Sequence, residues 1–357
     1  MNTYFTPGPT QRFPTIPQHL KNAVDEEIIS IAHRGKGFQV LFEKATNGLR
    51  KLMNIPANYH IFFVSSATEA MERIIQGTVE KNSIHFTTGV FSERMYDFAR
   101  DLKKNARQVK AKDGETFTHK ELIIPKTVEL ACFTHNETST GVMMNLTDIY
   151  NVKKSNPNIL LSLDIVSSAP YVNVDFRYID CAFISVQKGF GLPAGLGIVI
   201  VSPQAIMKAH ALQKKDINIG ANFHNLVGML YQSQTHEMIE TPNILALYLL
   251  GNVLEDMLTI GIETIRKQTN QKAKLIWDFF ENNMSKYSLF VKNQDIRSPT
   301  VTVVEVKGGS MSLIEKLKSK SFIVGFGVRP EYKEKHIRIT NFPAHTLEDV
   351  KKLLSFF

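Results

Sequence analysis

Short, nearly continuous apolar runs that alternate with helical patterns constrain the fold of this chain more than any other feature. A strand that is apolar along its whole length is covered on both faces, and helical stretches between such strands indicate βαβ units. The pattern predicts an α/β fold with a mostly parallel central sheet, which binds ligands beyond the carboxyl ends of its strands. The predicted strands are 60–64, 83–87, 130–134, 159–163, 181–185 and 196–201.

The chain length and a second alternation predict two domains. With 357 residues the chain is longer than one hydrophobic core usually covers. A helical stretch from 244 to about 285 is followed by predicted strands at 300–306 and 336–339, with a helix at 311–320 between them. We therefore expect an N-terminal segment, a large ligand-binding domain and a smaller α/β domain, at residues 1–15, 16–250 and 251–357.

Composition and charge narrow the possible partners. The net charge of +8 comes from scattered lysines and arginines without a long basic run, so we expect no nucleic-acid partner. The first residues lack a basic segment followed by an apolar one, and no apolar run has membrane-spanning length. These features predict a cytoplasmic protein without a membrane partner. Cys132 and Cys181 lie in apolar runs, which indicates core residues and no metal site.

Lys188 follows a buried strand and precedes a glycine-rich, uncharged loop. Burial disfavours the ammonium form of lysine, and a neutral lysine is a nucleophile that captures a carbonyl cofactor as a Schiff base. Taken alone, such a position more often holds a lysine whose stem is covered and whose ammonium reaches solvent. The nearby glycines follow neither the dinucleotide-binding nor the Walker pattern, which disfavours an NAD or ATP enzyme.

Three other polar positions follow predicted strands. Ser66, Ala67 and Thr68 precede a helix predicted at 69–79, whose free N–H groups suit a phosphate, although the hydroxyls could simply cap the helix. Asp164 would need a cationic partner if it is buried, such as a protonated pyridine nitrogen; otherwise it is a turn residue. The loop that holds Thr138 could orient a phenolate oxygen or satisfy the backbone of a turn.

Taken in chain order, these segments resemble the class V, fold-type I, pyridoxal-phosphate aminotransferases over essentially the whole sequence. The resemblance implies a pyridoxal 5'-phosphate cofactor and a homodimer whose active sites are shared across the interface. Its motifs are at 5–10, 65–70, 89–91, 135–141, 164–168, 187–188 and 241–243.

The resemblance also implies a role for individual residues. Lys188 would carry the cofactor as a Schiff base and move the substrate proton, and Asp164 would hold the ring nitrogen protonated. Phe91 would stack on the ring, unless it is a core phenylalanine. The other expected cofactor contacts are phosphate contacts from Ala67 and Thr68, a phenolate contact from Thr138, a contact from Gln187, and Thr241 reaching the phosphate of the neighbouring subunit.

The segment around His33 and Arg34 resembles the phosphoserine aminotransferases, in which such a pair binds the substrate phosphate across the dimer interface. An arginine fork beside an imidazole suits a phosphate dianion. Arg329 lies where that family has a second His-Arg pair, but Val328 replaces the histidine. Arg338 matches the arginine that binds the substrate α-carboxylate. The alternatives are surface ion pairs for Arg34 and Arg329, and a charge on a strand face for Arg338.

The predicted function is amino transfer from glutamate to 3-phosphohydroxypyruvate on the route to serine. Two segments, 7–9 and 137–141, instead resemble alanine–glyoxylate and serine–pyruvate aminotransferases, which leaves such an enzyme as an alternative. An alternative of another class is a non-catalytic, cofactor-bound or DNA-associated regulator, although no helix-turn-helix region supports it. A cysteine desulfurase is excluded because no cysteine follows Cys181.

Overall fold

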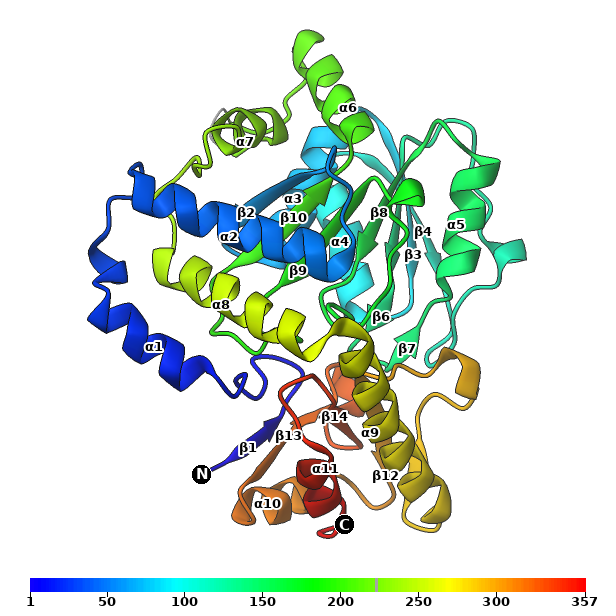
Figure 1. Cartoon of the computed structure of the whole chain (residues 1–357). Helices are drawn as coiled ribbons and strands as arrows, with labels where there is room; N and C mark the ends of the chain where they lie inside the picture. The colour runs from blue at the N-terminus through cyan, green and yellow to red at the C-terminus, as the bar shows by residue number, and fades with distance from the viewer. Residues whose placement is uncertain (222–223) are drawn as a thin grey trace.

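A seven-stranded sheet forms the centre of the large domain in the computed structural model, which describes residues 1–221 and 224–357 (Figure 1). Its five strands from β9 to β4 are parallel, and β10 runs antiparallel to both β9 and β2. The predicted α/β fold with a mostly parallel sheet is thus confirmed. In sheet order the strands are β2 (His60–Val64), β10 (Gly197–Val201), β9 (Cys181–Ser185), β8 (Leu160–Asp164), β5 (Leu130–Thr134), β3 (Asn82–Thr87) and β4 (Asn105–Lys110).

Helices cover both faces of this sheet, which explains why its central strands are apolar throughout. Successive residues of a strand face opposite sides, so Ile61 and Phe63 pack in one core cluster while Phe62 and Val64 pack in another. The first cluster includes α2 (Lys36–Met53), α5 (Leu146–Ser155) and α8 (Ile244–Ile260). The second includes α3 (Ala67–Thr78), α4 (Val90–Asp101), α6 (Pro203–Lys214) and α7 (Leu226–Ser233), and it also contains both free cysteines.

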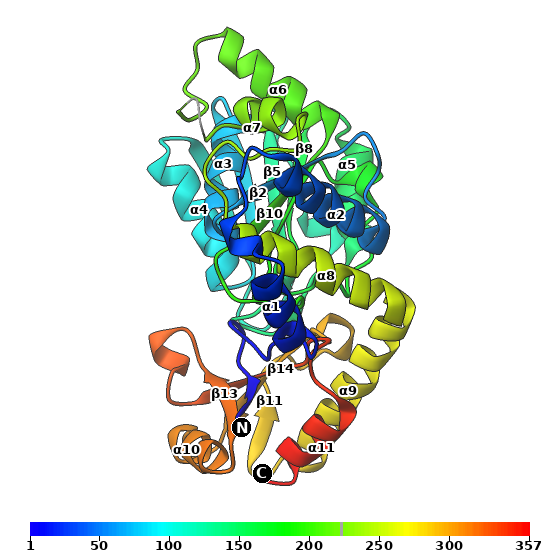
Figure 2. The ribbon, with the colours of Figure 1, turned by 60° about the vertical axis from the view of Figure 1, so that its left-hand side comes forward.

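The small domain has a five-stranded sheet, and the start of the chain supplies one of its strands. In sheet order these are β1 (Thr3–Phe5), β13 (Phe322–Phe326), β14 (His336–Thr340), β12 (Val301–Val306) and β11 (Tyr287–Leu289). Both termini therefore lie in the small domain (Figures 1 and 2). Its helices are α9 (Ile262–Asn282), α10 (Met311–Ser319) and α11 (Leu347–Leu354). Helix α1 (Ile16–Asp25) lies against α8, and a hairpin of β6 (Asn136–Glu137) and β7 (Val142–Met143) follows β5.

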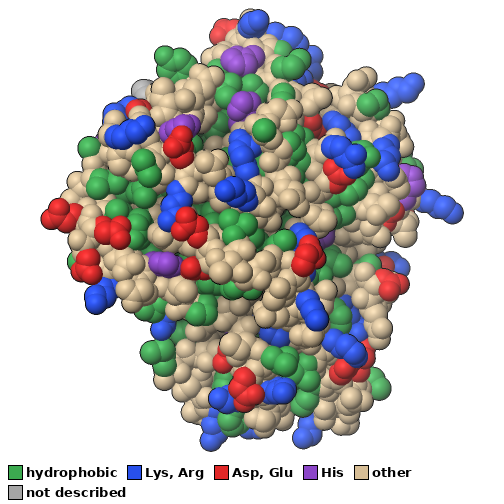
Figure 3. All heavy atoms as spheres, viewed as in Figure 1, with side chains coloured by type: hydrophobic (Ala, Val, Ile, Leu, Met, Phe, Trp, Pro, Cys, Tyr) green, Lys and Arg blue, Asp and Glu red, His purple; other side chains and the backbone are tan. Residues whose placement is uncertain are grey.

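The passage between the domains is a sharp bend between α8 and α9 at Gly261, which has a φ of +85°. The boundary expected at 250/251 falls inside α8, which packs on α2. Within the described residues no single helix is long and apolar enough to cross a membrane, but the bent pair α8 and α9 passes the same test of length and composition. On the face drawn in Figure 3, basic and acidic side chains are interspersed rather than gathered by sign.

Candidate active site

A cavity of about 250 Å³ opens at the carboxyl ends of the parallel strands, beneath the N-terminal segment. Parallel strands and the helices that follow them bring residues from distant parts of the sequence to this edge. The cavity wall therefore holds most of the residues predicted to bind the cofactor, namely Ala67, Thr68, Phe91, Thr138, Asp164, Gln187 and Lys188.

Lys188 is buried at this cavity instead of extending to solvent. Its Nζ donates a hydrogen bond to the carbonyl oxygen of Pro7 and lies 5.7 Å from the ring centre of Phe91. Burial lowers the pKa of Lys188 to about 8, and the nearby positive charges of Arg338 and Arg94 act in the same direction. A lysine with such a pKa is partly neutral near pH 7, as a nucleophile requires.

Gly8 lets the N-terminal segment lie directly against this lysine. It has a φ of +135°, and a Cβ there would be 2.6 Å from Cδ, Cε and Nζ of Lys188. Glycine alone adopts such a φ without steric cost and leaves room for the amine. The Pro-Gly-Pro segment at the start of the chain thus forms one wall of the site.

Asp164 ends strand β8 with a carboxyl group that is almost fully buried. Burial raises the pKa of Asp164 to about 7, although the backbone N–H of Val166 donates a hydrogen bond of 2.8 Å to Oδ1. A buried carboxylate without a cation is unfavourable. The position therefore suits a ligand that brings a protonated nitrogen to Asp164.

The start of helix α3 forms another part of the cavity wall. Ser66 caps the helix, because its Oγ accepts a hydrogen bond of 3.2 Å from the backbone N–H of Glu69. The simple capping role considered for this hydroxyl is thus present, while Ala67 and Thr68 line the cavity at the positive end of the helix dipole. A Cβ at Gly197 would be 2.5 Å from the Ser66 backbone, so glycine allows β10 to approach the loop before α3.

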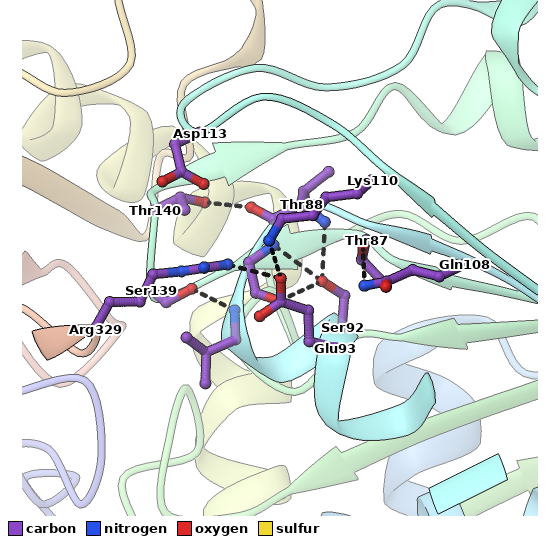
Figure 4. Close-up of polar contacts among 12 residues, drawn as sticks. Thr87, Thr88, Ser92, Glu93, Gln108, Lys110, Asp113, Ser139, Thr140 and Arg329 are labelled. Atoms are coloured by element: carbon purple, nitrogen blue, oxygen red, sulfur yellow. Dashed lines mark hydrogen bonds and ion pairs between the residues drawn. The ribbon is translucent and has the colours of Figure 1, made fainter. Parts of the chain in front are cut away.

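A buried carboxylate that sequence reasoning missed joins Phe91 to the loop of Thr138. The Glu137 side chain accepts hydrogen bonds from the backbone N–H groups of Phe91 and Ser92, at 3.1 and 3.0 Å. It also accepts one of 2.6 Å from Ser139 Oγ. Ser139, which is labelled in Figure 4, in turn accepts a hydrogen bond from the Val90 N–H. Glu137 thereby satisfies the free N–H groups at the start of α4 and fixes the backbone of Phe91.

Asn136 and Arg94 also line the cavity and were not predicted. The Asn136 amide donates to Ser167 Oγ at 2.7 Å and to Thr300 Oγ1 at 3.1 Å, while its Oδ1 is buried without a partner among the described residues. Asn136 directly precedes Glu137, and Arg94 lies one turn after Phe91. In the sequence, only their closeness to predicted site residues could have indicated that Asn136 and Arg94 line the cavity.

The residues predicted to bind across a dimer interface lie away from the cavity of their own subunit. Arg34 is exposed on the loop before α2, where Nη1 is 3.6 Å from Glu237, and His33 beside it is half-buried. Thr241 is exposed before α8. None of the three lines the cavity formed by the described residues. The ion pair considered as the alternative for Arg34 is present at this distance.

The two C-terminal arginines differ in their surroundings. Arg329 donates from Nη2 to Glu93 at 2.8 Å, which is the ion pair considered as its alternative role (Figure 4). Arg338 is buried, and its Nε donates to the Phe326 carbonyl oxygen at 2.7 Å while Nη1 is 3.4 Å from the carbonyl oxygen of Thr138. Burial lowers the pKa of Arg338 to about 10. Arg338 thus brings a positive charge beside the cavity.

The chain matches the family model of the class-V aminotransferases over residues 3–328. It belongs to this family. A phosphoserine aminotransferase from Mannheimia succiniciproducens is 27% identical, with 99% of this chain and 96% of that protein covered. A solved structure of a phosphoserine aminotransferase from Cytophaga hutchinsonii is 42% identical with a TM-score of 0.96, covering 99% of this chain and 98% of the other.

An alanine–glyoxylate aminotransferase from Nostoc sp. has the same fold, with a TM-score of 0.84, 24% identity, and 99% of this chain and 94% of the other covered. The predicted family, fold and enzyme class are confirmed, and this class V aminotransferase is a pyridoxal-phosphate-dependent transaminase. The interpretation as a non-catalytic regulator is wrong, because the family and its relatives show a transaminase. The cavity fits the cofactor that the family implies, because an amine, a buried carboxylate and a helix N-terminus surround one space.

Proposed function

We propose that this class V aminotransferase transfers the amino group of glutamate to 3-phosphohydroxypyruvate and so forms phosphoserine. The observation that carries the proposal is the 42% identity to the phosphoserine aminotransferase of Cytophaga hutchinsonii, which extends over 99% of the chain. The phosphate-binding motif proposed at His33 and Arg34 supports the same substrate.

Pyridoxal phosphate bound in this cavity would supply an electron-withdrawing ring, which is the chemistry that makes the Cα–H of an amino acid acidic. Lys188 would hold the cofactor before the substrate arrives, and its amine, whose pKa burial lowers to about 8, would then take and return the Cα proton. Asp164 would keep a positive charge on the ring nitrogen, Phe91 would cover the ring face, and Thr138 would orient the phenolate oxygen; all three line the cavity. Ala67, Thr68 and Gln187, which also line it, would complete the cofactor contacts.

Arginines orient the substrate in this proposal. Arg338 binds the α-carboxylate of the substrate beside Thr138. The Nη1 atom of Arg338 is 3.4 Å from the carbonyl oxygen of Thr138. His33, Arg34 and Thr241 act in the active site of a second copy, so the functional unit is a homodimer. None of the three lines the cavity that the described residues of its own subunit form, and Arg34 and Thr241 are exposed on the subunit surface, which supports this arrangement. Arg329 contributes to phosphate binding once its pairing with Glu93 is released.

Half-reactions test the proposed substrate directly. We expect phosphoserine to convert the visible absorbance of the holoenzyme at least about tenfold more efficiently than alanine does, since a phosphate adds charge-assisted hydrogen bonds. Lys188→Ala should lack this absorbance. Arg34→Ala should slow the half-reaction with phosphoserine far more than the half-reaction with alanine. A wild-type enzyme that reacts faster with alanine would disprove the proposed substrate.

The second candidate is an alanine- or serine-dependent enzyme that uses glyoxylate or pyruvate. The pairing of Arg329 with Glu93 favours it, because one of the proposed phosphate-binding charges is already neutralised. The substitution of Val328 for a histidine removes another donor. The same half-reactions separate the two candidates.

A further inference from the structure

Arg94 is a positively charged residue of the cavity wall that has no carboxylate partner among the described residues. It lies on α4 one turn after Phe91, and its guanidinium carbon is 5.1 Å from the centre of the Phe91 ring. Residues three positions apart lie on the same face of a helix. The helix therefore presents the ring that covers the cofactor and a guanidinium to the same space.

No carboxylate among the described residues forms an ion pair with Arg94, whereas three other arginines in this part of the structure are paired. Arg73 on α3 is 3.6 Å from Glu69, Arg100 on α4 is 3.9 Å from Asp97, and Arg329 is 2.8 Å from Glu93. Arg94 is half-buried, and stacking on Phe91 compensates only part of the cost of covering its guanidinium. Arg94 thus keeps its full charge available to a ligand in the cavity.

The charge of Arg94 also acts on the reactive groups. After burial, it is one of the charges that lower the pKa of Lys188, and it opposes the rise in the pKa of Asp164. An anion that binds Arg94 would reduce this influence on both groups. The guanidinium is therefore close enough to the site of reaction for its occupancy to matter.

We propose that Arg94 is an anion-binding residue of the active site and binds a phosphate monoester inside the cavity. The guanidinium presents planar, paired N–H donors, which suit the oxygens of such a dianion. The phosphate belongs either to the cofactor, held with the start of α3, or to the substrate. Only the second source rests on the function proposed above.

Two ligand pairs identify the source of the phosphate in Arg94→Gln. In the first comparison, cofactor-free enzyme is titrated with pyridoxal phosphate and with pyridoxal, which lacks the phosphate, and visible absorbance reports binding. In the second, the holoenzyme reacts in single turnovers with phosphoserine and with alanine, and the concentration dependence gives an apparent dissociation constant. Arg100→Gln is the matched control, because Arg100 lies on the same helix with a 62% exposed side chain.

If Arg94 binds the cofactor phosphate, Arg94→Gln weakens the binding of pyridoxal phosphate about tenfold or more and leaves the binding of pyridoxal unchanged. If Arg94 binds the substrate phosphate, the variant raises the apparent dissociation constant of phosphoserine by a similar factor. The apparent dissociation constant of alanine and the affinity for the cofactor then stay unchanged. Arg94→Lys should restore part of either loss, and Arg100→Gln should change neither ratio. Equal weakening of both members of each pair, or no change in either ratio, would overturn the proposal.

The two proposals can fail separately. The preference of the wild-type enzyme for phosphoserine or alanine decides the proposed substrate. The role of Arg94 is decided by comparing Arg94→Gln with the wild type in two affinity ratios, that of pyridoxal phosphate to pyridoxal and that of phosphoserine to alanine. The cofactor comparison requires no substrate, so it tests Arg94 even in an enzyme that prefers alanine.

Discussion

Arg329 of the small domain donates a hydrogen bond of 2.8 Å to Glu93 of the large domain, and this ion pair joins the two domains. Both side chains are mostly covered, at 18% and 22% exposure, and Lys110 Nζ lies 2.9 Å from the same carboxylate oxygen (Figure 4). The hydroxyl of Tyr332 donates to Asp113 at 2.6 Å. Carboxylates of the large domain therefore hold the loop after β13 at two points.

Replacing Glu93 with glutamine should release Arg329 for substrate binding. A partly buried ion pair is lost, and the charge of the guanidinium is no longer offset by the Glu93 carboxylate, so it can bind an anion. We expect the KM for phosphoserine to fall about threefold to tenfold while the KM for alanine stays unchanged, as measured by steady-state kinetics. Glu331→Gln, an exposed carboxylate close to Arg329, is the control. A uniform rise in KM for both substrates would show that Glu93 only holds the domains together.

Gly8→Ala should block the attachment of the cofactor to Lys188. The added methyl group would lie 2.6 Å from the amine and from the last two carbons of the lysine side chain, so the lysine or the N-terminal segment must move. Such overpacking costs about 1 to 3 kcal/mol. Titration with pyridoxal phosphate, followed by visible absorbance, should show weaker binding.

A suitable control for this substitution is Gly308→Ala. Gly308 also has a positive φ, of +85°, but nothing lies within 4 Å of the position of its Cβ. It therefore imposes backbone strain without a contact at the site. The interpretation fails if both alanine variants bind the cofactor as the wild type does.

Glu137→Ala should destabilise the whole protein, because it leaves buried donors at the start of α4 without an acceptor. The lost hydrogen bonds include those from the N–H groups of Phe91 and Ser92, and each unsatisfied donor costs about 1 to 3 kcal/mol. Urea unfolding should show a loss of at least about 3 kcal/mol. Glu115→Ala, at an exposed position, should change the stability little. Equal unfolding midpoints for Glu137→Ala and the wild type would contradict this account.

The central strands could be predicted because burial on both faces leaves a local signal. Strand β4 was missed, since it is an edge strand with a polar, partly exposed sequence. Strand β1 was missed for another reason. It has three residues and exists only through its pairing with β13, which is more than three hundred residues away in the sequence.

The site was predictable where a residue's chemistry depends on its position at a strand end, as for Lys188 and Asp164. Glu137 and Arg94 were not predicted, because their roles arise where α4 meets the loop after β5. No local pattern marks a carboxylate that will accept hydrogen bonds from a helix start far along the chain. The roles of Arg34 and Thr241 require a second chain, so they remain predictions.

The pH dependence of stability should report the burial of Asp164 in the cofactor-free protein. The pKa of Asp164 is raised from 3.8 to about 7, so the folded state binds more protons than the unfolded state between these values. This group's contribution to stability is present below pH 3.8 and is lost as the pH rises through 7. The Asp164→Asn variant has no carboxyl group to ionise at this position, so its stability should not fall with rising pH through this effect.

Urea unfolding at pH 5 and pH 8 measures the effect, with the difference between wild type and Asp164→Asn taken at each pH so that other groups cancel. The wild type should lose roughly 2 to 3 kcal/mol relative to the variant between these two values. Saturating pyridoxal phosphate should reduce this loss, because a protonated ring nitrogen favours the charged carboxylate. An unchanged difference at pH 5 and pH 8 would mean that Asp164 is already ionised in the folded protein without a cationic partner.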